Sequence, residues 1–441
     1  MAQLVEQEKH TSPRLSHYLG EYRRSLEQGP QPRWLAQARE SAIAQFERLG
    51  FPTTKIEQWR FTSVEPIAER TFALATDGAE QAAPLARPLS APIAHAVCVN
   101  GRFAPLFSSN LDRLPKGVQI LGIEAALASQ PSLIEPYLAK LSLTQTGAFT
   151  SLNTAFLRDG IVIVIPARVV IEEPIEVTFA SVSENGGSMS HPRLLIVAGE
   201  ASQATVLERY VGQGAAFTNA VGEVWLGVNA VVDHYKLQED PADAFHIGGM
   251  FLHAARGGTF SSHSLTFGGR LVRNDVIATL AGEGVDCTLN GLYVGSGTQL
   301  IDNHTTIDHA MPHCGSHEVY KGILADQARA VFNGKIIVRP DAQKTDAKQT
   351  NKALLLSDDA NVNSKPELEI FANDVKCTHG AAIGQLDDAA MFYLRSRGLG
   401  VAEARAMLVR AFAGDILNRV KIEPVRTYLE GILTARLPHV E

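Results

Sequence analysis

A repeated spacing between short strands limits what the middle of this chain can fold into. From about 191 to 340, apolar runs rich in Val, Ile and Thr alternate with Gly, Asn and Asp, and no helical period of useful length interrupts them. Small turn residues precede comparable strands in steps of 26, 28 and 26 residues, at Ala204, Ala230, Gly258 and Gly284. Such a period favours stacked coils, although the spacing alone also allows a sandwich or a large barrel.

The stretch up to about residue 90 is predicted to be helical and polar. Apolar residues recur at helical intervals from Trp34 to Leu49, and Gly50 and Pro52 stand where such a helix would stop. The segment 77–92, rich in Ala and Pro, is predicted to be a linker. A domain boundary is therefore expected near residue 90.

Helical patterns return after Gly384. Asp387 or Asp388 is expected to cap a first helix that ends at Gly398, and Pro424 is placed to start a third. A second helix is predicted between them, with one apolar face made of Val401, Ala404, Leu408, Ala411 and Phe412. After a long strand region these short helices have no obvious intramolecular role, so we expect them to be a contact surface for a partner.

Length and composition bound the class of protein. A chain of 441 residues is longer than one compact core usually supports. We predict three units: a helical region with its linker over 1–90, a strand-rich core over 91–384 and a helical domain over 385–441. A formal net charge of -7 gives no electrostatic reason to expect binding to nucleic acid or to an anionic membrane. Proteins or small ions are the expected partners.

The cysteines and the apolar runs indicate the compartment. Four cysteines lie far apart without any Cys-x-x-Cys pair, which argues for reducing surroundings and against a disulfide framework. The first ten residues lack the basic and apolar regions of a signal peptide. The densest apolar run, Ile161 to Ile165, is far shorter than a membrane span. These features predict a cytoplasmic protein with no membrane association.

Cys377 and His379 are the main candidate metal ligands. They stand at i and i+2 in a strand-like run, so their side chains are expected on one face of an extended strand. Their Cα atoms would lie roughly 6.6 Å apart, too far for both to chelate one small ion easily. The pair is predicted to be part of a metal site. Cys377 is also of the type that is commonly a small buried hydrophobe, so packing remains its alternative role.

A second group of possible ligands lies between Asp302 and His317. It contains His304, His309, His313, Cys314 and His317. Their spacing fits no standard zinc pattern, and a strand-turn-strand would scatter them over different faces, so most are interpreted as ordinary polar residues. A stand-alone metalloenzyme built on this cluster stays an alternative. The chain lacks a phosphate-binding loop, a nucleophile elbow and a His-Glu-x-x-His helix, so no complete catalytic set is found.

Several separated segments carry a family resemblance, in the same order along the chain. They are Gly50–Thr62, Val331–Ile336, Lys344–Leu356, Lys376–Ala381 and Tyr393–Leu399. Together they resemble the SufB/SufD family of iron-sulfur cluster scaffold proteins of the SUF system. The Lys-Cys-Thr-His-Gly-Ala arrangement at Lys376–Ala381 is similar to the SufD branch of that family.

The resemblance implies a fold, a site and partners. It implies a mainly β protein, with a right-handed parallel β-helix core between N-terminal and C-terminal α-helical regions. It implies that His379, with Cys377 as a further candidate, contributes to a cluster-assembly site shared with the paralogue SufB through a β-helix contact. The C-terminal helices would dock the ABC-type ATPase SufC. The iron-sulfur cluster would be transient, with none tightly bound to this chain alone, and the chain would not be an enzyme.

One more class stays open beside the metalloenzyme. Elongated β-helices often act on polysaccharides, although the predicted coils show no obvious run of stacked acidic residues or exposed aromatics. The sequence leaves undecided the cluster type, the sulfur and iron donors, and whether the chain forms homodimers.

Overall fold

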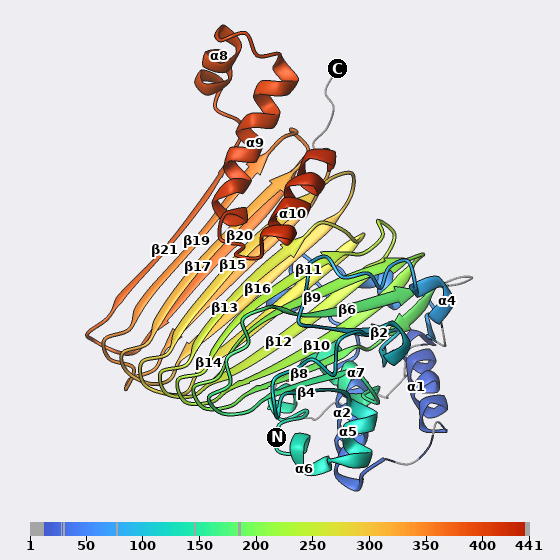
Figure 1. The fold of residues 1–441 in the computed structure, drawn as a ribbon. Coiled ribbons are helices and arrows are strands. Elements are labelled where there is room, and N and C mark those ends of the chain that lie inside the picture. The colour runs from blue at the N-terminus through green and yellow to red at the C-terminus, as the bar shows by residue number, and fades with distance from the viewer. Residues whose placement is uncertain are drawn as a thin grey trace, which may run out of the picture.

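Two mainly parallel sheets form the body of the molecule in the computed structural model (Figure 1). The structure describes residues 13–27, 29, 31–75, 78–144, 147–183 and 187–436. The first ten residues, used above in the signal-peptide argument, and Asp77 of the expected linker lie outside these ranges.

The first sheet, sheet A, holds strands from the whole length of the chain. Its path runs through β20 (Asn361–Ile370), β18 (Arg329–Val338), β16 (Leu300–His309), β14 (Leu271–Leu280), β12 (Phe245–Ala254), β10 (Ala216–Leu226), β8 (Arg193–Ala198), β5 (Ile161–Ile165) and β4 (Gln119–Gly122), with β7 (Ser188–Ser190) and β1 (Ala73–Leu74) at the side.

The second sheet, sheet B, takes the strands in between. Its order is β21 (Lys376–Gly384), β19 (Asp346–Leu355), β17 (Gly315–Leu324), β15 (Asp286–Gly295), β13 (Thr259–Thr266), β11 (Val231–Glu239), β9 (Gln203–Gln213), β6 (Ile175–Val182), β2 (Ala94–Val99) and β3 (Arg102–Phe103).

From β8 onward, successive strands alternate between the two sheets, so each coil of the chain adds one strand to each. On sheet B, Ala204 pairs with Val232, Val232 with Phe260, and Phe260 with Cys287. Each of these partners is 27 or 28 residues away, close to the period seen in the sequence. The predicted fold class, a β-helix core with helices at both ends, is confirmed.

The space between the inner faces of the two sheets, called the bore here, is filled by side chains. Alternation along each strand sends every second residue inward, and the buried aliphatic and aromatic inward residues of both sheets form one continuous cluster. Most of the bore is therefore an apolar core. Polar side chains interrupt it at a few levels, for example at Glu208, His234 and Lys236.

The N-terminal helices cover the outer face of sheet A. α1 (Pro13–Leu26) and α2 (Arg33–Leu49) pack with α7 (Ala148–Ala155) over Phe217 and Phe245 of the sheet. α2 ends at Gly50 with φ +63°, as the sequence predicts. The other helical turns are α3 (Glu65–Ala68), α4 (Ala79–Ala82), α5 (Ile123–Ser129), α6 (Pro131–Ile134), η1 (Glu57–Trp59), η2 (Pro105–Phe107) and η3 (Ser142–Thr144).

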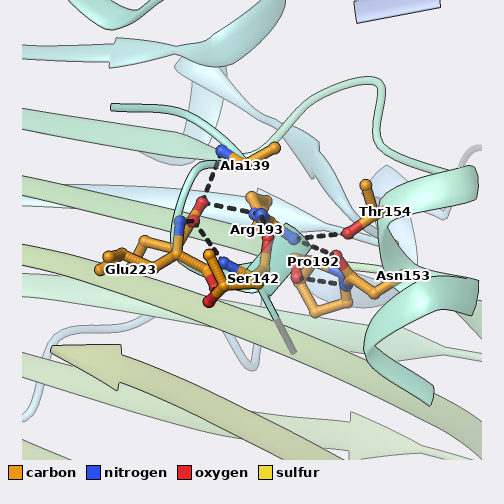
Figure 2. Close-up of polar contacts among 9 residues, drawn as sticks. Ala139, Ser142, Asn153, Thr154, Pro192, Arg193 and Glu223 are labelled. Atoms are coloured by element: carbon orange, nitrogen blue, oxygen red, sulfur yellow. Dashed lines mark hydrogen bonds and ion pairs between the residues drawn. The ribbon is translucent and has the colours of Figure 1, made fainter. Parts of the chain in front are cut away.

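A buried polar network fixes the segment around η3 and α7 to sheet A (Figure 2). Arg193 of β8 donates to Glu223 of β10, to Ser142 Oγ and to Asn153 Oδ1. The Glu223 carboxylate also accepts three backbone N–H groups, from Ala139 and residues 141 and 142. Both charged side chains are fully buried, so these contacts supply the partners that two buried charges require.

The C-terminal helices follow the predicted pattern in number and position. α8 (Asp388–Ser396) is capped by the Asp387 carboxylate, which accepts from two backbone N–H groups, and the chain turns at Gly398 with φ +96°. α9 (Val401–Leu417) and α10 (Glu423–Arg436) follow. The predicted apolar face of the second helix is right only in part. Ala404 is buried and Phe412 packs against the apolar cluster under α9, but Val401 is 48% exposed, and the other buried residues are Val409, Ala413, Ile416 and Leu417.

The expectation that these helices lack an intramolecular role is wrong for two of them. α9 and α10 pack on the outer face of sheet B and bury apolar residues of six strands there, from β9 to β19. The strand residues are Leu207, Tyr235, Leu237, Leu265, Leu292, Val294, Ile323 and Leu354, and Phe267 just after β13 joins them. α8 differs, because it has no buried residue and lies away from the sheets (Figure 1).

The domain limits at 90 and 384 stay predictions, and the helices α5 to α7 lie inside the range assigned to the core. Among the helices that the structure describes, none is both long enough and apolar enough to span a bilayer.

Candidate functional site

Cys377 and His379 both lie on β21, the last strand of sheet B. β21 pairs on one side only, with β19, so its other edge is open. Cys377 is half-buried and packs with Ile336 and Val338 of sheet A, which shows that its side chain faces the bore. His379, two residues further along the strand, shares that face and is exposed. The structure thus places both predicted ligands at the open end of the bore.

The surroundings of Cys377 keep its thiol protonated. Burial and the nearby Asp346 carboxylate raise the pKa of the Cys377 thiol, against the backbone N–H of Ala347, which lowers it. Lys376 alternates to the opposite face of the strand and does not offset this shift. A metal ion that binds here must therefore displace a proton from sulfur.

Two polar residues stand behind His379 on the inner face of sheet B. In the strand register His379 lies beside Gln349, and Gln349 lies beside Glu318. Gln349 Nε2 donates to Glu318 Oε2 at 2.8 Å. Burial raises the pKa of the Glu318 carboxyl to about 7, although the Thr305 and Gln349 side chains lower it. The sequence alone did not predict this pair, whose only local signal is polar residues at inward positions of strands.

The side chains of the histidine-rich segment between Asp302 and His317 do not converge on one point. His304 lies on the outer face of sheet A and pairs with Asp302 at 2.9 Å, while His309 faces the bore and bonds Ser316 Oγ at 2.9 Å. Cys314 is buried in a turn, where its thiol donates to the Gly282 carbonyl. The interpretation of this segment as scattered polar residues agrees with these positions.

Asp302 instead contacts the N-terminal segment Gly50–Thr62, which is one of the segments that carry the family resemblance. Its carboxylate accepts from Thr62 Oγ1 at 2.6 Å and from Arg273 at 2.9 Å. Arg273 also stacks on the Trp59 ring, with 3.8 Å from the guanidinium carbon to the ring centroid. A cleft of about 580 Å³ lies between this segment and sheet A. Its charged side chains include ion pairs such as Lys365 with Glu57 and Arg273 with Asp275.

Within the part of the chain that the structure describes, no three His, Cys, Asp or Glu side chains are grouped so that they could hold a metal ion. Cys377 and His379 therefore supply at most part of a ligand set.

The open end of the β-helix is suited to pairing with another strand edge. β20 and β21 are each hydrogen-bonded on one side only, and apolar side chains stand exposed around them: Ile370 (40%), Phe371 (61%) and Ile383 (46%). Pro366 on β20 fits such a position, because proline cannot donate to a ladder and is confined to edge strands.

A second exposed surface lies on the C-terminal helices. α8 exposes Phe392 (76%) and Tyr393 (57%), and α9 exposes Val401 (48%) in its first turn and Met407 (40%) further along. A groove of about 1140 Å³ runs between α9 and α10, and small residues such as Gly414 and Gly431 line it.

Sequence comparison places this geometry in a family. Residues 179–412 match the family described as SUF system FeS cluster assembly, SufBD core domain, and residues 15–177 match the SufBD protein N-terminal region. The chain belongs to the SufBD family. The predicted family is thereby confirmed, and the SufBD core match includes the edge strands, Cys377 and His379.

Relatives match over most of their length. A SufBD family protein of Synechocystis is 33% identical, and the match covers 91% of each chain. The iron-sulfur cluster assembly protein SufD of Escherichia coli is 31% identical over 90% of this chain and 92% of its own. The SufD of Bacillus subtilis is 26% identical over 95% and 97%. The SUF system of iron-sulfur cluster assembly is therefore the setting in which the open end must be interpreted.

Proposed function

We propose that this chain is a non-enzymatic scaffold subunit of the SUF machinery, in the position that SufD holds among its relatives. The observation that carries the proposal is the open end of the β-helix, where His379 and Cys377 lie on the bore-facing side of the last strand, beside two unpaired strand edges. Two ligands at an open edge are an incomplete site. A second chain that docks on this edge would complete it.

The proposed second chain is the paralogue SufB. Edge strands offer rows of free N–H and C=O groups, and the apolar residues Ile370, Phe371 and Ile383 offer area to bury against a similar edge. The cluster is the substrate of such a site. Sharing it between two subunits allows release, because a small shift of one subunit removes part of the ligand set. The cluster is accordingly transient, with none tightly bound to this chain alone.

The proposed docking surface for the ATPase SufC is α8 together with the adjacent turn of α9. Their exposed aromatic and apolar side chains are the anchor type that protein interfaces use, and Arg395 and Arg397 at the end of α8 favour an acidic counterpart. ATP hydrolysis by the docked partner would then move this end of the β-helix. The predicted cytoplasmic location stays a prediction.

The two enzyme alternatives receive no support from a specific observation. His304 and His309 lie on opposite faces of β16, which removes the basis for a metalloenzyme built on that segment. A polysaccharide-active β-helix would leave the α8 surface without a role.

The test of the site uses His379→Ala, with Thr378→Ala as the matched control on the opposite face of β21. In cells whose only cluster assembly system is this one, His379→Ala should lower the activity of cluster-dependent enzymes about 10-fold or more, while complex assembly persists. Thr378→Ala should behave as wild type. Normal enzyme activity in His379→Ala cells would remove the proposed site.

The test of the ATPase surface uses Phe392→Ala combined with Tyr393→Ala, and Leu106→Ala as a control, since Leu106 is 93% exposed elsewhere on the molecule. SufC should fail to co-purify with the double variant, whereas it should co-purify with Leu106→Ala as it does with the wild type. Retention of SufC by the double variant would place the docking surface elsewhere.

A further inference from the structure

A column of inward side chains leads from His379 into the bore. Gln349 on β19 and Glu318 on β17 occupy successive positions below His379 in the register of sheet B. Neighbouring strands lie about 4.8 Å apart and paired residues point to the same face. Gln349 is 2% exposed and Glu318 is 1% exposed. The column thus joins the exposed candidate ligand to a buried carboxyl group.

The orientation of the Gln349 amide is set inside this column. Its Nε2 donates to Glu318 Oε2, which turns the amide oxygen away from that atom. Gly334 on the opposite sheet makes room for the amide, because a Cβ atom at Gly334 would lie 2.1 Å from Gln349 Nε2. The amide is therefore confined between Glu318 and a glycine.

Among the residues that the structure describes, two atoms of this arrangement lack a hydrogen-bond partner, Glu318 Oε1 and Gln349 Oε1. Both atoms are buried. A buried acceptor without a donor costs about 1–3 kcal/mol, so such an atom calls for an explanation. The next residue in the column is His379, whose ring N–H is a donor of the right type.

We propose that Gln349, held by Glu318, is a positioning residue for His379. Its Oε1 accepts the N–H of the imidazole nitrogen that does not bind metal, when the ring turns toward the bore. Histidines that ligate metals generally need such an acceptor, which fixes the tautomer and the ring direction. Gln349 and Glu318 do not themselves touch the cluster. The inference rests on the proposed role of His379 as a ligand.

Gln349→Leu is the decisive variant, because leucine fills similar space without an acceptor. The matched control is Asn351→Leu on the same strand and the same inner face. Asn351 is 1% exposed and donates to Ser364 Oγ at 2.9 Å, yet its neighbour on β21 is Ala381, not a histidine. Both variants remove one buried amide from β19, so a general effect on packing is common to them.

The first measurement is the nitrogen NMR spectrum of the full-length chain with labelled histidine, in which His379→Ala assigns the His379 signals. One tautomer of His379 should predominate in the wild type and in Asn351→Leu. In Gln349→Leu the two nitrogens should shift toward the mixture seen for free histidine. An unchanged His379 spectrum in Gln349→Leu overturns the proposal, whatever happens to stability.

The second measurement is the activity of cluster-dependent enzymes in cells that rely on this system alone. Gln349→Leu should lower it about 10-fold, as loss of an outer partner of a metal ligand typically does, and Asn351→Leu should not. Equal losses in both variants would assign Gln349 to packing. Normal enzyme activity in His379→Ala cells removes the ligand role of His379, whereas an unchanged tautomer in Gln349→Leu removes only the positioning role of Gln349.

Discussion

Arg193 and Glu223 form an ion pair of 2.7 Å between neighbouring strands, with both side chains fully buried beneath the segment of η3 and α7. Removing one partner leaves the other charge buried and uncompensated. Arg193→Met should therefore lower the free energy of unfolding by about 3–5 kcal/mol. Urea unfolding of the full chain measures this effect.

The matched control for that substitution is Arg168→Met. Arg168 and Glu200 form an ion pair of 3.8 Å whose side chains are 80% and 57% exposed. Exposed pairs contribute about 0–1 kcal/mol, so this variant should unfold nearly as the wild type does. Equal effects of the two substitutions on unfolding would show that the buried network does not fix the segment around η3 and α7.

Glu318 should make stability depend on pH. Its folded-state pKa of about 7 lies above the ordinary value of 4.5, so the folded state holds a proton that the unfolded state has lost between these values. Stability should fall as pH rises from about 4.5 to about 7 and then level off. The neighbouring Cys287 and Tyr320 have pKa values raised above their ordinary values, so they do not titrate in this window.

Glu318→Gln tests that assignment. The variant keeps an oxygen for Gln349 Nε2 but carries no charge, so the part of the slope due to this residue should disappear. Above pH 7 the variant should be more stable than the wild type by roughly 3 kcal/mol, since one pKa unit corresponds to about 1.4 kcal/mol. Parallel stability curves for the two proteins between pH 4.5 and 7 would contradict it.

Cys377 has two possible roles that one variant separates. As a packing residue beside Ile336 and Val338, its loss in Cys377→Ala should cost about 1 kcal/mol of stability with normal cluster output. As a ligand, its loss should lower cluster output while the unfolding midpoint stays nearly unchanged. We expect the second result, because the side chain stands at the open end beside His379. Normal output from this variant leaves His379 as the ligand of this chain.

Deletion from Asp387 onward should disrupt more than partner binding. It uncovers the apolar outer face of sheet B that α9 and α10 bury, including Tyr235, Leu237 and Phe267. The shortened chain should aggregate on size-exclusion chromatography, whereas the α8 variant Phe392→Ala with Tyr393→Ala should stay monodisperse. A well-behaved shortened chain would mean that the packing of α9 and α10 contributes little.

The sequence was most informative where the signal is local. The Asp387 cap and the left-handed turns at Gly50 and Gly398 could be predicted because each depends on a few adjacent residues. The pairing of Cys377 with His379 on one strand face could be predicted for the same reason, because alternation is a property of the strand itself. The buried face of α9 could be predicted only in part, since several of its faces carry apolar residues and the sheet selects one.

The sequence by itself determined the strand-rich core, its repeat length, the terminal helices and the family, because these follow from periodicity and from motifs read along the chain. Only the tertiary structure decided that Glu318, Gln349 and His379 form one column, although they are separated by 31 and 30 residues. It also decided that the side chains of His304 and His309 lie on opposite faces of β16. The physical reason is that stacking between coils depends on the length of every intervening turn. A difference of one residue in a turn would shift the register and move each of these side chains to a different neighbour.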